Sequence, residues 1–359
     1  MLVPEVKLEE WRKLYQAAAD FLEQDSWDWI MEEDIFGVRN PDTGEIGYCS
    51  ILSSDDSFPG LAVHLGTRGL ESFMRCIKGE DDSVGESDET GEEEVSDFDS
   101  LQHLSTVNCL MLSYSDREQL EEEDRQVIKS LGLKFRGRGA WPLFRSYTPG
   151  YVPWFLNSAE VRFLTIALRE ATDVALRFRD DLMLLYARED DTYLVRTPAA
   201  AGKDAPWTDS YLLPEPPPQE ESPLDAPTEE RIKKVLAASP ARTGRWEADV
   251  FFFPQAMTEE TDRPYFLLVF AVFNQVTGRL LLYNISRYES RASKFRAVFL
   301  DMLEKEGTLP GEIVTINPDV KNLLLPLAGK LKISLCNVKT LKHMEACKRD
   351  ILEAMASSH

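Results

Sequence analysis

Apolar segments of strand length and amphipathic segments of helix length follow one another in a fixed order between Trp246 and Met355, and this order limits the possible folds more than any other feature. Three apolar segments come first, and two further ones then alternate with three helical segments. Three strands in a meander followed by right-handed βαβ crossovers predict a mixed sheet of order β-β-β-α-β-α-β-α with helices on its faces. The segments are expected at 246–253, 265–274, 279–286, 291–306, 312–317, 320–331, 332–338 and 341–355.

The first part of the chain mixes helical patterns with hairpin patterns. Residues 8–22 place apolar side chains three and four positions apart, which predicts an amphipathic helix. FGVRN and IGYCSIL flank the turn sequence PDTGE, which predicts an antiparallel hairpin at 36–52. This part is therefore expected to be an α+β domain. Further strands are expected at 61–65 and 108–115, a closing hairpin at 181–187 and 191–197, and helices at 69–76, 116–131 and 158–178.

Two stretches of biased composition divide the chain. Residues 198–228 interleave proline with acids, which favours an extended spacer between domains or, alternatively, a docking peptide for a proline-reading domain. Residues 79–100 carry eleven acids and no base, half of the net charge of −22. This composition predicts a disordered acidic loop, or a tether for a basic partner. We expect an N-terminal α+β domain at 1–197 with the loop at 79–100, a linker at 198–228 and a C-terminal domain at 229–359.

Composition excludes several classes of function. The acidic net charge argues against nucleic-acid binding, because contacts with the phosphate groups dominate the affinity of proteins for nucleic acids. No apolar run approaches the length of a membrane span, and the start has no secretory pattern, so a cytoplasmic protein is expected. The five cysteines are dispersed and suit reduced thiols, and no metal site is expected from the spacing of cysteine and histidine. His64 lies in an alternating strand, which indicates a half-buried sheet histidine.

The element order of the C-terminal part resembles that of the ribonuclease H-like fold, found in ribonucleases H, integrases and transposases. In active members, carboxylates on the first strand, after the fourth strand and on a later helix hold two divalent metals. The resemblance implies Asp249, Asp319 and Glu345 (or Glu353) as catalytic carboxylates, with Mg²⁺ or Mn²⁺ as cofactor. The same residues are also expected at strand edges, helix caps and solvated surfaces, in which case no cofactor is bound.

A basic and aromatic segment, 134–154, is the strongest surface candidate for binding. It combines arginine with aromatic residues and with glycine and proline, a set that can receive a carboxylate, a phosphate or a peptide. The same residues can simply pack an irregular crossover onto the sheet. The candidate binding residues are Arg136, Arg138, Arg145, Tyr147 and Trp154.

The whole chain resembles an uncharacterised bacterial family, chiefly of Gram-positive organisms, with two consecutive domains of unknown function. The segments FGVRNPDTGEIGYCSI and AVHLGTRGLESF carry the resemblance in the first half, and FAVFNQVTGRLLLYNIS and EIVTINPDVKNLLLPLAGKLKISL carry it in the second. It implies a bacterial cytoplasmic origin and no activity. Function is therefore not determined, and a non-catalytic binding or regulatory protein, with a protein or small anionic ligand as partner, is favoured over a metal-dependent phosphodiesterase.

Overall fold

The computed structural model describes residues 3–52, 59–77, 97–186, 191–199, 206–216, 224–238, 240–259 and 263–357. The chain divides into two compact units. The first unit comprises Met1–Glu80, Thr106–Pro217 and Glu260–Arg263, and the second comprises Asp81–Ser105, Pro218–Glu259 and Pro264–His359. Among the described residues, no helix combines the length and apolarity that a membrane span requires.

The first unit is built on a mixed sheet, whose described strands number seven, in the order β5-β4-β3-β2-β1-β6-β7. Neighbouring strands are antiparallel except β1 and β6, which are parallel. The hairpin expected at 36–52 is confirmed by the β1–β2 pair. The strands are β1 (Phe36–Arg39), β2 (Ile46–Leu52), β3 (Gly60–Leu65), β4 (Cys109–Ser115), β5 (Trp141–Tyr147), β6 (Tyr193–Pro198) and β7 (Trp207–Leu212).

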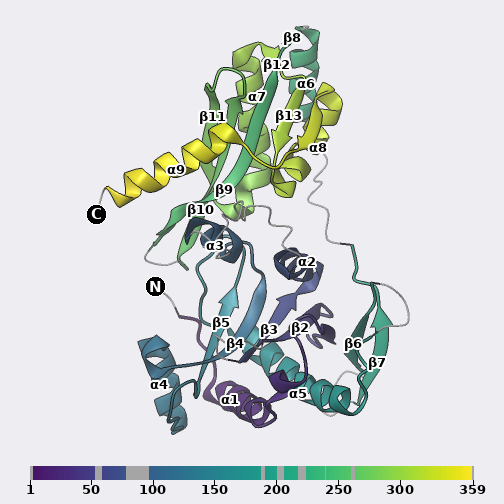
Figure 1. Ribbon diagram of the computed structural model, residues 1–359, viewed down its shortest axis with the longest axis vertical. Coiled ribbons are helices and arrows are strands. Elements are labelled where there is room, and N and C mark those ends of the chain that lie inside the picture. Colours follow the sequence, from purple (N-terminus) through teal and green to yellow (C-terminus); the bar gives the residue numbers. More distant parts are fainter. Residues whose placement is uncertain are drawn as a thin grey trace, which may run out of the picture. The chain divides into compact units, whose positions relative to one another are not determined.

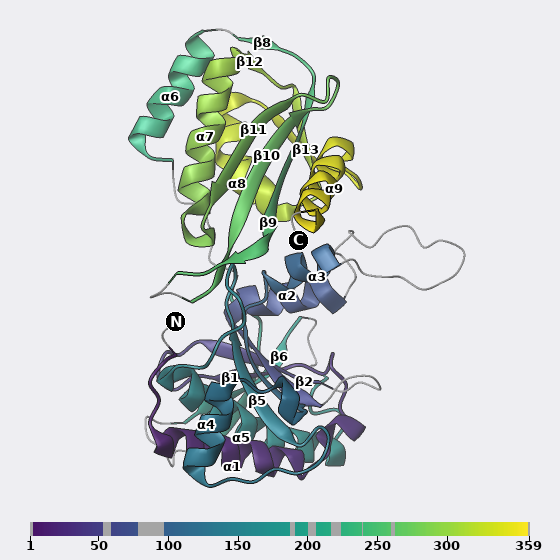
Figure 2. The ribbon, with the colours of Figure 1, turned by 90° about the vertical axis from the view of Figure 1, so that its left-hand side faces the viewer.

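Helices cover both faces of this sheet (Figure 2). Three pack on one face around a single apolar cluster, and the helix predicted at 8–22 is confirmed as one of them. The fourth packs on the other face, where Leu70 and Phe73 meet Tyr48. On that face His64 is buried against the ring of Phe73, and burial lowers its pKa to about 4, so the imidazole is neutral. The helices are α1 (Leu8–Leu22), α4 (Glu122–Leu131) and α5 (Ser158–Asp180) on the first face and α2 (Gly66–Ile77) on the second.

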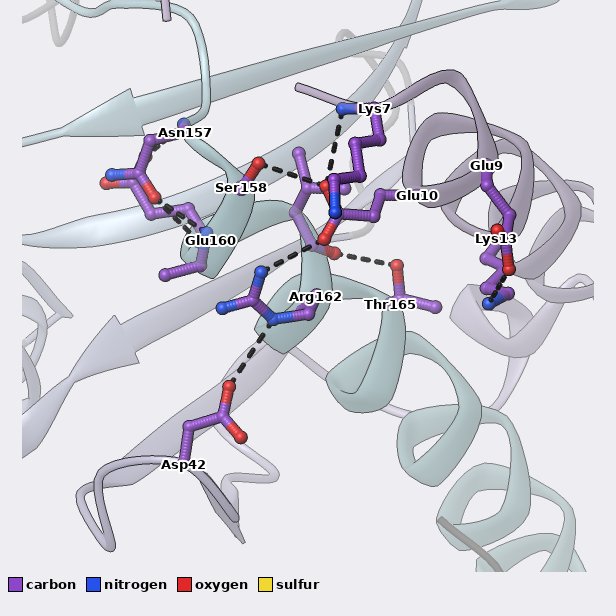
Figure 3. Close-up of polar contacts among 12 residues, drawn as sticks. Lys7, Glu9, Glu10, Lys13, Asp42, Asn157, Ser158, Glu160, Arg162 and Thr165 are labelled. Atoms are coloured by element: carbon purple, nitrogen blue, oxygen red, sulfur yellow. Dashed lines mark hydrogen bonds and ion pairs between the residues drawn. The ribbon is translucent and has the colours of Figure 1, made fainter. Parts of the chain in front are cut away.

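Polar contacts join the start of α1 to the start of α5 (Figure 3). Glu10 accepts hydrogen bonds from the guanidinium of Arg162 at 3.0 Å and the hydroxyl of Ser158 at 3.0 Å, and Arg162 also contacts Asp42 at 3.4 Å. Partial desolvation raises the pKa of Glu10, but these hydrogen bonds outweigh it and the net direction is downward. Asn157 caps α5, because its side chain accepts the backbone N–H groups of Ala159 and Glu160.

The second unit contains a mixed sheet of five described strands in the order β11-β10-β9-β13-β14 (Figure 1). β9, β10 and β11 form an antiparallel meander, while β13 and β14 run parallel to β9 on its other side. A short parallel pair, β8 with β12, lies apart from this sheet. The strands are β8 (Ala241–Arg242), β9 (Arg245–Met257), β10 (Tyr265–Asn274), β11 (Leu280–Ser286), β12 (Thr308–Leu309), β13 (Glu312–Thr315) and β14 (Ser334–Asn337).

Helices also cover both faces of the second sheet. On one face, Phe270 of β10 packs against Phe295 and Phe299 of α7, with α6 and α8 beside that helix. On the other face, α9 and α3 pack on β9 (Figure 2). The helices are α3 (Asp97–Leu104), α6 (Ala226–Ala237), α7 (Arg291–Glu306), α8 (Pro318–Leu331) and α9 (Lys342–Ala356).

Four expectations about the elements need correction or refinement. The apolar segment at 181–187 forms turns as far as Tyr186, not a strand, and β6 instead pairs with β7. β7 and the start of α6 lie inside the range expected as linker, 198–228. The helix expected at 116–131 is a 3₁₀ turn followed by α4. Residues 97–104 form α3 of the second unit, although all of them were expected in the first domain and 97–100 in its acidic loop, and residues 79–96 of that loop lie outside the described residues.

Candidate functional site on strand β9

Strand β9 carries two acids among apolar residues on one face of the second sheet. Successive side chains of a strand point to opposite faces, so Glu247 and Asp249 share a face with Phe251. Phe251 belongs to the apolar cluster that includes Met344 of α9. Both acids therefore lie under α9, where Glu247 is 0% and Asp249 1% exposed. Charged groups buried to this degree require partners inside the protein.

The partner of Asp249 is a lysine of α9. The Nζ atom of Lys348 lies 2.7 Å from Oδ2 of Asp249. Oδ1 of the same carboxylate accepts the N–H of Val250 at 2.8 Å. The ammonium also lies 5.2 Å from the ring centroid of Phe251 and 5.9 Å from that of Phe98, a residue of α3. The aromatic faces add cation–π attraction to the ion pair.

Glu247 is held by the beginning of α9. Its Oε2 accepts the backbone N–H groups of His343 at 3.0 Å and Met344 at 3.3 Å. These N–H groups belong to the first turn of the helix, which has no internal acceptor for them and carries the positive end of the helix dipole. Its other oxygen, Oε1, is buried and makes no hydrogen bond within the described residues.

The other two carboxylates of the predicted metal site, Asp319 and Glu345, are exposed, and each residue makes a hydrogen bond near its own helix start. Asp319 is exposed in the first turn of α8, and its N–H donates to Oδ1 of the capping residue Asn317 at 2.8 Å. It is Asn317, through its Nδ2, that reaches β9, where it donates to the carbonyl of Val250 at 2.9 Å. Glu345 is exposed on α9 and its Oε1 accepts the N–H of Leu341 at 3.2 Å. Across the described residues, no three His, Cys, Asp or Glu side chains gather in a way that could hold a metal ion.

In the basic and aromatic segment 134–154, Arg145 is an internal ion-pair residue. It is 8% exposed and makes two bonds to the carboxylate of Asp124, at 3.0 and 2.8 Å, with Glu121 at 3.2 Å. Burial alone would lower the pKa of Arg145, but the two acids raise it above its ordinary value. The guanidinium also lies 4.7 Å from the ring centroid of Phe155. Arg145 is therefore engaged within the first unit.

The remaining residues of that segment differ in exposure. Arg136 is exposed, and the side chain of Arg138 is 86% exposed at 3.6 Å from Asp116. Tyr147 is half-buried, and burial raises its pKa. Trp154 is half-buried too, and its backbone pairs with that of Ser146. Arg136 and Arg138 are thus accessible to solvent, whereas Arg145 is engaged in ion pairs within the first unit.

The sequence pointed to Asp249 but not to Glu247, Lys348 or Gln102, a residue of α3 whose side-chain amide bonds the backbone of Phe252 on β9. Glu247 had a signal in the sequence, because WEADVFFF places two acids two positions apart in an apolar strand, and hence on one face. Lys348 and Gln102 lie 99 and 147 positions from Asp249, with no local pattern that relates them to it. Their role becomes visible once the helices are placed on the sheet.

Comparison with known protein families gives two matches. A model described as "Domain of unknown function (DUF7309)" matches residues 11–196, and one described as "Domain of unknown function (DUF6930)" matches residues 231–352. Searches of curated proteins and of solved structures found no match. Both models describe domains without an assigned function, so the comparisons attach no catalytic role to the site on β9. The first match spans more than half of the chain, which therefore belongs to the DUF7309 family and carries a DUF6930 domain after it.

Proposed function

We propose that this protein is a non-catalytic binding protein whose second unit has ribonuclease H-like topology with an internal ammonium in place of metal ions. The arrangement of β9 supports the topology. It lies in the centre of the sheet, with the meander β10–β11 on one side and the parallel strands β13–β14 on the other. This is the arrangement that a meander followed by two crossovers produces.

The Asp249–Lys348 pair carries the proposal. A metal-dependent site needs first-strand carboxylate oxygens open to a divalent cation. Here one oxygen of Asp249 lies against Lys348 and the other accepts a backbone N–H. A cation beside Asp249 would also lie close to the ammonium and be repelled by it. The carboxylate therefore serves to anchor α9 on the sheet.

The class of partner follows from charge and compartment. The net charge of −22 opposes a nucleic-acid ligand, so a protein partner is the better match. The five cysteines are all unpaired, which suits a reducing compartment, in keeping with the proposed bacterial cytoplasmic origin.

The proposal predicts that the protein does not hydrolyse phosphodiesters. The full chain is incubated with bis(p-nitrophenyl) phosphate, single-stranded DNA and RNA in Mn²⁺ or Mg²⁺, next to the Asp249→Asn variant. We expect background rates that are equal for both proteins. Metal-dependent turnover that falls by a factor of 10 or more in Asp249→Asn, while the fold remains intact by circular dichroism, would favour the phosphodiesterase instead and overturn the proposal.

A further inference from the structure

Helix α3 is the one described helix of the second unit that comes from the first half of the sequence. It lies between α2 and β4 along the chain, both of which belong to the first unit. It nevertheless packs on β9, with Phe98 buried to 7% exposure in the cluster under α9. The contact joins residues that lie 150 positions apart in the sequence, so it is a long-range contact.

Gln102 fixes α3 to β9 through two hydrogen bonds to one residue. Its Oε1 accepts the backbone N–H of Phe252 at 2.6 Å, and its Nε2 donates to the carbonyl of Phe252 at 2.9 Å. The side-chain amide thus presents one donor and one acceptor to the strand, as a residue of a neighbouring strand would.

These backbone groups are available because β13 is shorter than β9. The β9–β13 pairing extends only to Glu247 opposite Val314. Beyond this point, side chains form the hydrogen bonds to the backbone of β9 on that side. Asn317 bonds the carbonyl of Val250, and Gln102 bonds both groups of Phe252. A buried strand edge of this kind needs such partners, because unpaired backbone groups are costly.

Phe98 provides the apolar part of the contact. Its ring centroid lies 6.1 Å from that of Phe251, and the Lys348 ammonium lies 5.9 Å from it. Phe98 and Gln102 are four positions apart, so they lie on one face of α3. The helix has eight residues, fewer than the roughly 12–15 that an isolated helix needs to be stable in water. Its order therefore depends on docking.

We propose that the surface formed by the ring of Phe251, the backbone of Phe252 and the ammonium of Lys348, here called the α3-docking surface, is a recognition site for a short helix. Its ligand carries an aromatic side chain and, four positions later, a glutamine, and α3 is the intramolecular example. A partner protein that presents a helix with the same pair competes with α3 for the surface. This inference rests on the proposed binding function and specifies the partner.

The test uses the full chain with α3 disabled by Phe98→Ala together with Gln102→Ala. A fluorescein-labelled peptide with the sequence Asp97–Ser105 is titrated with the variant, and its fluorescence anisotropy is measured. We expect saturable binding to the double variant, at least about 10-fold tighter than to the wild type. In the wild type α3 competes at an effective concentration in the millimolar range. A Ser100→Ala variant, changed at an exposed position of the same helix, should behave as the wild type.

A control peptide with alanine in place of the phenylalanine and the glutamine should not bind. Equal binding of both peptides, or no difference between wild type and double variant, would overturn the inference. If the double variant does not fold, hydrogen exchange on Gln102→Ala decides. The Phe252 amide must lose protection while the Val269 amide in the central ladder keeps it, and unchanged protection of Phe252 refutes the role of α3. Neither result bears on phosphodiester hydrolysis, so failure here leaves the non-catalytic function standing.

Discussion

Replacing Arg196 by methionine lowers the free energy of unfolding of the first unit by about 3–5 kcal/mol, the usual cost of removing one partner of a buried ion pair. Arg196 and Glu170 are 9% and 8% exposed, and the guanidinium donates to Glu170 through Nε at 2.9 Å. It also contacts Asp173 at 3.1 Å and Asp209 at 2.6 Å, and so ties β6 and β7 to α5. The variant would leave the carboxylate of Glu170 buried without its counter-charge.

The dependence on pH separates this loss from a simple packing defect. Burial raises the pKa of Glu170 in the wild type, against the lowering effect of Arg196, and without that arginine the pKa rises further. A carboxyl whose folded pKa exceeds the unfolded value favours unfolding as pH rises, because the unfolded chain ionises first. The difference in unfolding free energy between the wild type and Arg196→Met should therefore shrink as pH falls toward 4. Denaturant unfolding at several pH values measures this difference, and a difference that is constant with pH would contradict the explanation.

Arg177→Met is the matched control. Arg177 contacts the same acids, Asp173 and Asp209, but its side chain is 36% exposed. Ion pairs with this exposure contribute about 0–1 kcal/mol, so the control should lose less than about 1 kcal/mol. Equal losses in the two variants would mean that the burial of Glu170 is not what makes Arg196 important.

Replacing Lys348 by methionine destabilises the second unit by a similar amount, about 3–5 kcal/mol, because Asp249 then lies buried without an opposite charge. Asp249→Asn should cost less, about 1–3 kcal/mol, since the amide still accepts from Val250 and the partly exposed lysine can reach water. The double variant should be more stable than the sum of the single losses implies, by 1 kcal/mol or more.

Chemical unfolding of the four proteins provides this double-mutant cycle. Arg349→Met changes the next residue of α9, which is exposed, and should stay within about 0.5 kcal/mol of the wild type. Strictly additive losses in the cycle would show that Lys348 and Asp249 do not act as a pair.

Local patterns predicted most of the fold. The spacing of apolar residues located α1 and α5, and the turn PDTGE located the β1–β2 hairpin. The failures have physical causes. β7 (WTDSYL) is an edge strand in which no residue is fully buried, and it lies in a proline-rich region, so neither alternation nor composition indicated it. The apolar run at 181–187 looked like a strand, although Leu182 and Met183 are in fact 59% and 68% exposed in turns.

The candidate site was predicted only in part, because most of its contacts join residues far apart in the sequence. Asp249 was picked out because the resemblance to the ribonuclease H-like fold implies a carboxylate on the first strand of this sheet. Lys348 looked like any other lysine on an amphipathic helix, and Gln102 lay beside a highly acidic segment that suggested no packing at all. What these residues do depends on contacts between distant parts of the chain, and a single sequence does not contain those contacts.

We propose that Lys348, and not a metal ion, neutralises the charge of Asp249. The thermal unfolding midpoint of the second unit, measured with excess EDTA and with Mn²⁺ for the wild type and Asp249→Asn, tests this most directly. A metal that binds only the native site stabilises the folded state and so raises the midpoint. The shift in Asp249→Asn measures the contribution of nonspecific binding to surface acids, which is common to both proteins. We predict the same small response to Mn²⁺ in both proteins. A rise of several degrees in the wild type that is absent in Asp249→Asn would contradict the claim.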